Sequence, residues 1–201
     1  MKRTTRIGSA ALAAMAAAAL GMPLASAAQA APAASLAPAT VTAQAAATAM
    51  TIAWPVLREG TNAQWPLVTV RSLQYLLNAR GARLSVDGIF GPKTKAAVIA
   101  FQRAHRLPTD GVVRAGTWRA LIITVRYGSR GSAVRAVQDQ ANFRNLRDGH
   151  SLDVDGIYGP KTRAWVIGFQ KAMRTMIPGF AVDGIVGPQT WNALIGEALA
   201  G

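Results

Sequence analysis

The chain has 201 residues and a formal net charge of +13, with 22 Lys and Arg against 9 Asp and Glu and no cysteine. The absence of cysteine excludes a disulfide framework, a lipid-anchored cysteine and a cysteine nucleophile. The positive balance favours an anionic partner, such as nucleic acid, anionic lipid or an acidic cell-wall polymer, or serves solubility alone.

The first 30 residues have the order of a secretory signal peptide. Basic residues open the chain, an alanine-rich apolar run follows, and small residues surround Ala28-Gln29-Ala30. Because the run is short and weakly hydrophobic, cleavage is favoured over a membrane anchor. We expect a secreted protein without stable membrane insertion, whose 19 Lys and Arg against 9 Asp and Glu give a net charge of +10. The Ala-, Pro- and Thr-rich segment 31–53 is predicted to be a flexible linker.

The rest of the chain contains an internal repeat. Residues 86–94, Val-Asp-Gly-Ile-Phe-Gly-Pro-Lys-Thr, return at 154–162 as Val-Asp-Gly-Ile-Tyr-Gly-Pro-Lys-Thr, an offset of 68. Two copies are therefore predicted, from about 54 to 122 and from about 124 to 199. The first copy carries a net charge of +7 and the second +3.

Each copy also contains a second, degenerate version of its motif. In all four instances a Thr lies seven positions after the Asp, and in three a Pro stands at the expected first helical residue. Gly after Asp permits a positive φ, and the Asp can accept backbone hydrogen bonds, so each motif is predicted to be a turn that leads into a helix. The signature residues are Asp87, Gly88, Thr94, Asp110, Gly111, Thr117, Asp155, Gly156, Thr162, Asp183, Gly184 and Thr190.

One of the four motifs departs from the others. Arg114 and Ala115 replace the Gly-Pro pair in the second motif of the first copy. Because proline fixes the first helical φ, its loss predicts a looser or differently shaped helix start there.

Three helices are predicted in each copy from apolar residues at helical spacing. In the first copy they follow Val70, run from Pro92 to about His105, and surround Trp118; in the second they follow Val134, run from Pro160 to about Met173, and run from Pro188 to about Leu199. The predicted fold is all-α, with two tandem three-helix bundles. A bundle of ~65 residues buries only about 60% of its unfolded surface, so packing between the copies would add stability.

The ordered motifs resemble the peptidoglycan-binding domain of type 1, a three-helix module attached to many bacterial wall hydrolases. The resemblance rests on Val-x-x-Leu-Gln at 70–74, the nine-residue motif at 86–94, Ala-Val-x-x-Phe-Gln at 97–102 and Thr-Trp-x-x-Leu at 117–121. It covers nearly all of the chain after the linker, twice. It implies binding of peptidoglycan through its glycan or its stem peptide, with anionic wall polymers as further partners.

Catalysis is not expected from the residues present. There is no cysteine nucleophile, the only histidines are His105 and His150, and four of the nine carboxylates recur at equivalent turns, where they serve the fold. We expect a non-enzymatic, cell-wall-associated protein without metal or cofactor, acting as an anchor or as a targeting component for a separate wall enzyme. An interaction or inhibitor protein and a wall hydrolase with an unrecognised site are the alternatives. Nucleic-acid binding is not expected, because the basic residues are spread over both copies.

Four residues are candidate ligand contacts. In each main motif an aromatic ring and a lysine could meet a sugar ring and a carboxylate, namely Phe90, Lys93, Tyr158 and Lys161. The alternative is that each ring packs in its own bundle and each lysine is only solvated. Trp118 and Trp191 are predicted core residues, whereas Trp54, Trp65 and Trp165 break the repeat, and an exposed one would be a candidate for sugar stacking.

Overall fold

The computed structural model describes residues 52–61, 67–144 and 151–196. The predicted signal peptide (1–30) and all but the last two residues of the predicted linker (31–53) lie outside the described residues. None of the helices in the described ranges has the length and apolar character needed to cross a membrane.

Six α-helices and no strands form in the described part of the chain, which confirms the predicted all-α fold. Each copy of the repeat contributes three consecutive helices, called here the first and the second module. The first module contains α1 (Leu67–Ala79), α2 (Pro92–Ala104) and α3 (Ala115–Leu121). The second contains α4 (Ser132–Arg144), α5 (Pro160–Met176) and α6 (Pro188–Ile195).

The helices that follow the Asp-Gly turns all begin in one way. Gly91, Gly159 and Gly187 are extended N-cap residues, each followed by the proline that starts α2, α5 or α6. At α3 the N-cap is Arg114, and its φ of −121° and ψ of −179° lie in the same extended region. The looser start predicted for α3 is therefore wrong, because an arginine adopts an extended N-cap conformation as readily as a glycine does.

One fully buried tryptophan fills the centre of each module, as predicted. Trp118 on α3 and Trp191 on α6 are each 0% exposed. Their indole N–H groups donate to the backbone oxygens of Pro55 (2.8 Å) and Ile123 (2.8 Å), in the segment that enters each module. The third helix of each bundle is thereby tied to its own entry segment.

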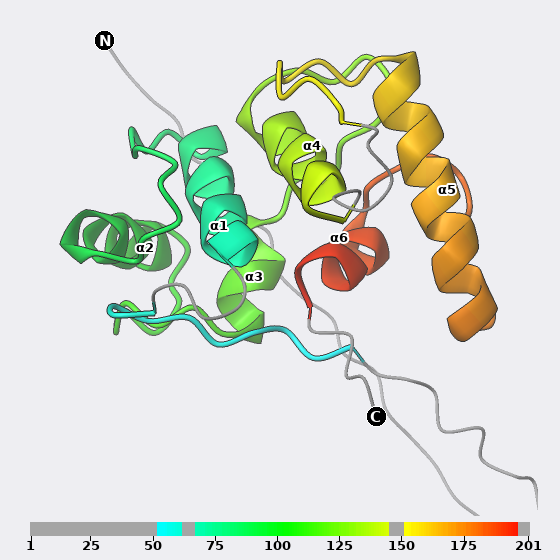
Figure 1. Ribbon diagram of the computed structural model, residues 1–201. Helices are drawn as coiled ribbons and strands as arrows, with labels where there is room; N and C mark the ends of the chain where they lie inside the picture. The colour runs from blue at the N-terminus through cyan, green and yellow to red at the C-terminus, as the bar shows by residue number, and fades with distance from the viewer. Residues whose placement is uncertain (1–51, 62–66, 145–150, 197–201) are drawn as a thin grey trace, which may run out of the picture. The chain divides into compact units, whose positions relative to one another are not determined.

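The two modules meet where α1 packs against α4, which Figure 1 shows side by side. Arg71 on α1 binds both carboxylate oxygens of Asp139 on α4, at 2.8 and 3.0 Å. Next to this pair, Gln140 Nε2 donates to Ser72 Oγ (2.9 Å). A single apolar cluster contains buried residues of both modules, so the two small bundles share one core.

Candidate functional site

A buried glutamine organises the first Asp-Gly turn. Gln74 on α1 is 1% exposed, and its Nε2 donates to Asp87 Oδ1 (2.7 Å) and Thr94 Oγ1 (3.3 Å). Its Oε1 accepts the Gly88 amide proton at 2.9 Å. One side chain thus connects α1 to the turn and to the first turn of α2, which satisfies polar groups that burial would otherwise leave unpaired.

The same arrangement recurs in the other three motifs. Gln102, Gln138 and Gln170 accept the amide proton of the turn glycine at 3.0, 2.8 and 2.8 Å. Each also donates to the hydroxyl of the motif threonine, at 3.3, 3.3 and 3.2 Å. These four glutamines, with the Asp, Gly and Thr of the turns that they contact, are called here the glutamine networks.

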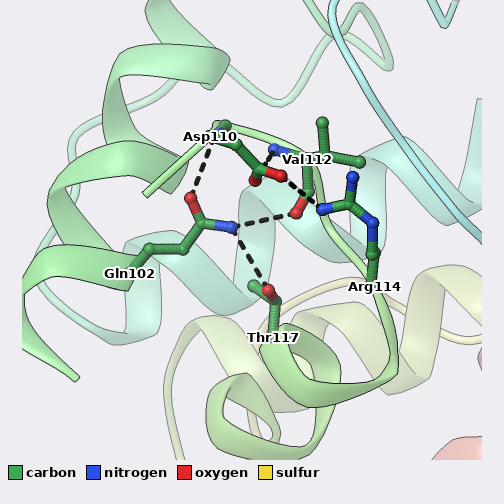
Figure 2. A network of polar contacts seen from close by, with 6 residues as sticks. Gln102, Asp110, Val112, Arg114 and Thr117 are labelled. Atoms are coloured by element: carbon green, nitrogen blue, oxygen red, sulfur yellow. Dashed lines mark hydrogen bonds and ion pairs between the residues drawn. The ribbon is translucent and has the colours of Figure 1, made fainter. Parts of the chain in front are cut away.

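Figure 2 shows the network that deviates most from the others. Gln102 points its amide into the turn and donates to Val112 O (2.9 Å) and to Thr117. The Asp110 carboxylate accepts the Val112 amide proton (2.9 Å) and pairs with Arg114. The arginine that replaces the usual glycine therefore takes part in the network through an ion pair.

The turn prediction is confirmed, including its need for glycine. The turn glycines have φ values of 72° to 77°. This left-handed conformation is energetically unfavourable for a residue that has a Cβ atom. At Gly111 an added Cβ would also lie 2.9 Å from Lys95 Cγ. The structural role of the glutamines was not predicted, although one Gln precedes each of the four Asp-Gly motifs. These glutamines follow Leu73, Phe101, Val137 and Phe169.

Hydrogen bonding lowers the pKa of three turn carboxyls, Asp87, Asp110 and Asp155, below the ordinary value of 3.8. The largest cause is the Gln74 side-chain amide at Asp87 and a backbone N–H at the other two. A carboxyl with a lowered folded-state pKa adds stability that is fully present above its unfolded pKa and is lost as the pH falls through the folded pKa.

We therefore expect the free energy of unfolding to fall as the pH drops below about 3.8. The Asp87→Asn variant keeps the acceptor oxygen for Gln74 and Ile89 but cannot titrate, so it should lose less stability over the same acidic range. Urea unfolding at neutral pH and on both sides of 3.8 measures the difference. An equal acid loss in the variant would show that Asp87 does not contribute to the pH dependence.

The structure separates the four predicted ligand contacts. Phe90 and Tyr158 are each 1% exposed, and the Tyr158 hydroxyl donates to Gly184 O (2.8 Å). Burial raises the pKa of this phenol above its ordinary value of 10.0. A sugar cannot stack on a buried ring, so these two rings follow the alternative interpretation, in which each ring packs in its own bundle. Lys93 and Lys161 are exposed, and ligand binding by either stays a prediction.

A pocket of about 480 Å³ lies beside Lys161 in the second module. Its lining includes Asp153, Asp155 and Ile157, and Ile157 is 41% exposed. Apolar, acidic and basic groups therefore meet in a space large enough for a small ligand.

The remaining candidates are half-buried or lie outside the described ranges. Trp54 stacks on Trp118 (6.0 Å between ring centroids) and Trp165 on Phe169 (5.4 Å), and neither is fully exposed. Trp65 and His150 lie outside the described residues, and within these no three His, Cys, Asp or Glu side chains are grouped to hold a metal ion.

Comparison with known proteins gives one family and several relatives. A family model described as a putative peptidoglycan binding domain matches residues 68–121 and 130–194, one match in each module. The zinc D-Ala-D-Ala carboxypeptidase of Streptomyces albus G is 40% identical over 68 residues, 32% of this chain and 25% of that protein. The N-acetylmuramoyl-L-alanine amidase CwlL of Bacillus licheniformis is 29% identical over 136 residues, 65% of this chain and 36% of the amidase.

Among solved structures, the endolysin of Burkholderia phage AP3 is 40% identical, with a TM-score of 0.29 over 36% of this chain and 24% of that one. The chain thus spans about a quarter to a third of the length of the relatives that it matches. The two curated relatives carry the names of enzymes, a carboxypeptidase and an amidase, which overturns the expectation of a non-enzymatic protein. The two matches to one family model cover more than half of the chain, which therefore belongs to the putative peptidoglycan binding domain family and carries two copies of it.

Proposed function

We propose that the two modules bind bacterial peptidoglycan and hold the protein at the cell wall after secretion. The observation that carries this proposal is the match of both modules to one peptidoglycan-binding family. The names of the relatives support the same polymer, because D-Ala-D-Ala and N-acetylmuramoyl-L-alanine are both parts of peptidoglycan. The net charge of +10 expected after removal of the signal peptide suits the free carboxylates of the stem peptides and the phosphates of other wall polymers.

The packing of α1 on α4 supports binding by both modules together. Because Arg71 and Asp139 join the modules across a shared core, one contact with the polymer places the second module near the same wall. The second contact then needs no further ordering of a linker, and the combined affinity exceeds that of either module alone.

Retention on purified wall sacculi tests the proposal. We expect the chain to be retained, and retention to weaken with salt, since exposed charges are screened. The double variant Lys93→Gln/Lys161→Gln should be retained less, because both predicted cations are lost. Lys171→Gln is the matched control, an exposed lysine on the same helix as Lys161 but outside its pocket. Retention no better than that of an unrelated protein of equal charge would refute peptidoglycan binding.

Cleavage of the wall is a second candidate function, favoured by the enzyme names of the relatives. Its test is the turbidity of a wall suspension incubated with the purified chain. A fall in turbidity together with new soluble wall fragments would establish cleavage, and a constant turbidity with the chain retained on the walls would favour binding alone.

A further inference from the structure

A second pocket, of about 420 Å³, opens in the first module between the C-terminal parts of α1 and α2. Its floor is apolar and includes Leu77, Ala97 and Phe101. Arg80, Arg83 and His105 line it as basic groups, and no acidic residue does. Its volume and its mixture of apolar surface with a few charged groups are typical of small-ligand sites.

The two arginines of this pocket differ in whether their guanidinium groups already form hydrogen bonds within the protein. The Arg80 guanidinium donates to the backbone oxygens of Ala120 (3.0 Å), Leu121 (3.2 Å) and Ile122 (3.0 Å), which end α3. Arg83 is exposed and makes no hydrogen bond or ion pair within the described residues. Arg83 is therefore the guanidinium that remains available to a ligand.

The second module shows which of these features belong to the fold. Arg144, the counterpart of Arg80, donates in the same way to Ala193 O (3.3 Å) and Leu194 O (2.8 Å) at the end of α6. This contact is shared by both modules, so it is structural. The pocket residues Arg83, Ala97 and His105, in contrast, are replaced at the equivalent positions by Ser151, Trp165 and Met173.

These replacements alter the size and charge of the site. The Trp165 ring stacks on Phe169, the counterpart of Phe101, with ring centroids 5.4 Å apart and planes 9° apart. An indole therefore covers the phenylalanine in the second module. In the first module the methyl group of Ala97 stands at that position, and the smaller ring of His105 lies against Phe101, with ring centroids 4.2 Å apart. Arg83 and His105 have the neutral counterparts Ser151 and Met173, so among the described residues the open basic pocket is a feature of the first module.

We propose that this pocket binds the carboxylate-bearing end of a peptidoglycan stem peptide. The inference rests on the proposed function and names the part of the polymer that the first module contacts. A floor lined by alanine, leucine and phenylalanine side chains accepts the methyl group of an alanine residue. A free guanidinium forms a charge-assisted pair with the adjacent carboxylate, whereas a neutral glycan would leave it unpaired.

Calorimetric titration of the full chain tests the site with three probes: a short stem peptide ending in D-Ala, the same peptide with an amidated end, and an uncharged N-acetylglucosamine oligomer. We expect the free acid to bind about tenfold more tightly than the amide, because only the acid forms the charge-assisted pair. The sugar oligomer should not compete with the peptide.

Three variants locate the binding. Ala97→Trp gives the first module the residue of the second and should weaken peptide binding at least tenfold, and Arg83→Gln should remove the preference for the free acid. Ala96→Trp is the matched control, because Ala96 is an exposed neighbour on α2 that does not line the pocket. Its affinity should equal that of the unaltered chain. If Ala97→Trp unfolds the module, the Arg83→Gln variant tests the site instead. Arg83 is exposed and forms no hydrogen bond or ion pair within the described residues, so its replacement should leave the fold intact.

Unaltered peptide affinity in both pocket variants, or displacement of the peptide by the sugar oligomer, would overturn the inference. Retention on sacculi would then still support the proposed function, so the two can fail separately. A chain that binds neither sacculi nor peptide would refute both.

Discussion

Replacement of Gln138 by leucine is expected to lower the free energy of unfolding by about 3 kcal/mol or more. The side chain is 2% exposed and accepts the buried Gly156 amide proton (2.8 Å). It also donates to Asp155 Oδ1 (2.8 Å), Ile157 O (3.1 Å) and Thr162 Oγ1 (3.3 Å). Leucine has a similar volume but leaves the buried Gly156 amide and Thr162 hydroxyl without their partner, and each buried polar group left unpaired costs about 1–3 kcal/mol.

Gln140→Leu is the matched control for this prediction. Gln140 lies two residues further along α4 and is 0% exposed, so the substitution and the burial are the same. Its Nε2 donates only to Ser72 Oγ, and its Oε1 has no partner. Leucine removes an unpaired acceptor but leaves one buried group, Ser72 Oγ, without its donor, so we expect a loss of about 1 kcal/mol, smaller than that of Gln138→Leu. Urea unfolding followed by circular dichroism measures both, and equal losses would show that the glutamine networks contribute no special stability.

The helices and turns could be predicted because their signals are local. An Asp-Gly pair, a proline and a threonine at fixed spacing define a turn and the helix after it, without reference to the rest of the chain. The same is true of Trp118 and Trp191, whose spacing to Leu121 and Leu194 places them on the buried face of a helix.

The role of the glutamines could not be predicted from spacing alone. Gln74 stands among apolar residues on α1, and a polar residue there resembles one on a solvated face. It is buried because the turn at 87–89, which follows later in the chain, packs over it and forms hydrogen bonds with both its amide nitrogen and its amide oxygen. The one sequence pattern that indicates this role is the repetition of a glutamine before each of the four Asp-Gly motifs.

The aromatic residues of the motifs illustrate a second limit. A ring between two glycines suggests an exposed turn, but Gly88 and Gly156 have positive φ values, and the following Phe90 and Tyr158 rings lie in the core. The basic pocket of the first module is likewise a matter of tertiary structure. The exchange of Ala97 for Trp165 is visible in the repeat, yet its consequence follows only from the stacking of the indole on Phe169.

Trp191→Ala is expected to cost about 3–5 kcal/mol, the range for removing a large aromatic side chain from a core. The ring is 0% exposed, and its loss also leaves the Ile123 carbonyl without the indole N–H. Because one apolar cluster joins both modules and α1 packs on α4, the loss should destabilise the first module as well. Native-state hydrogen exchange would then show equal losses of protection for the most protected amides of α2 and of α5.

Trp118→Ala in the first module is the reciprocal variant and should give the same pattern, with α5 amides losing as much protection as α2 amides. Trp54→Ala is the milder control, because Trp54 is only half-buried and stacks on Trp118 from outside the helices. A loss confined to the module that carries each substitution would show that the bundles unfold independently. Equal losses would instead mean that the α1–α4 contact transmits most of the stability of each module to the other, since neither small bundle buries enough surface alone.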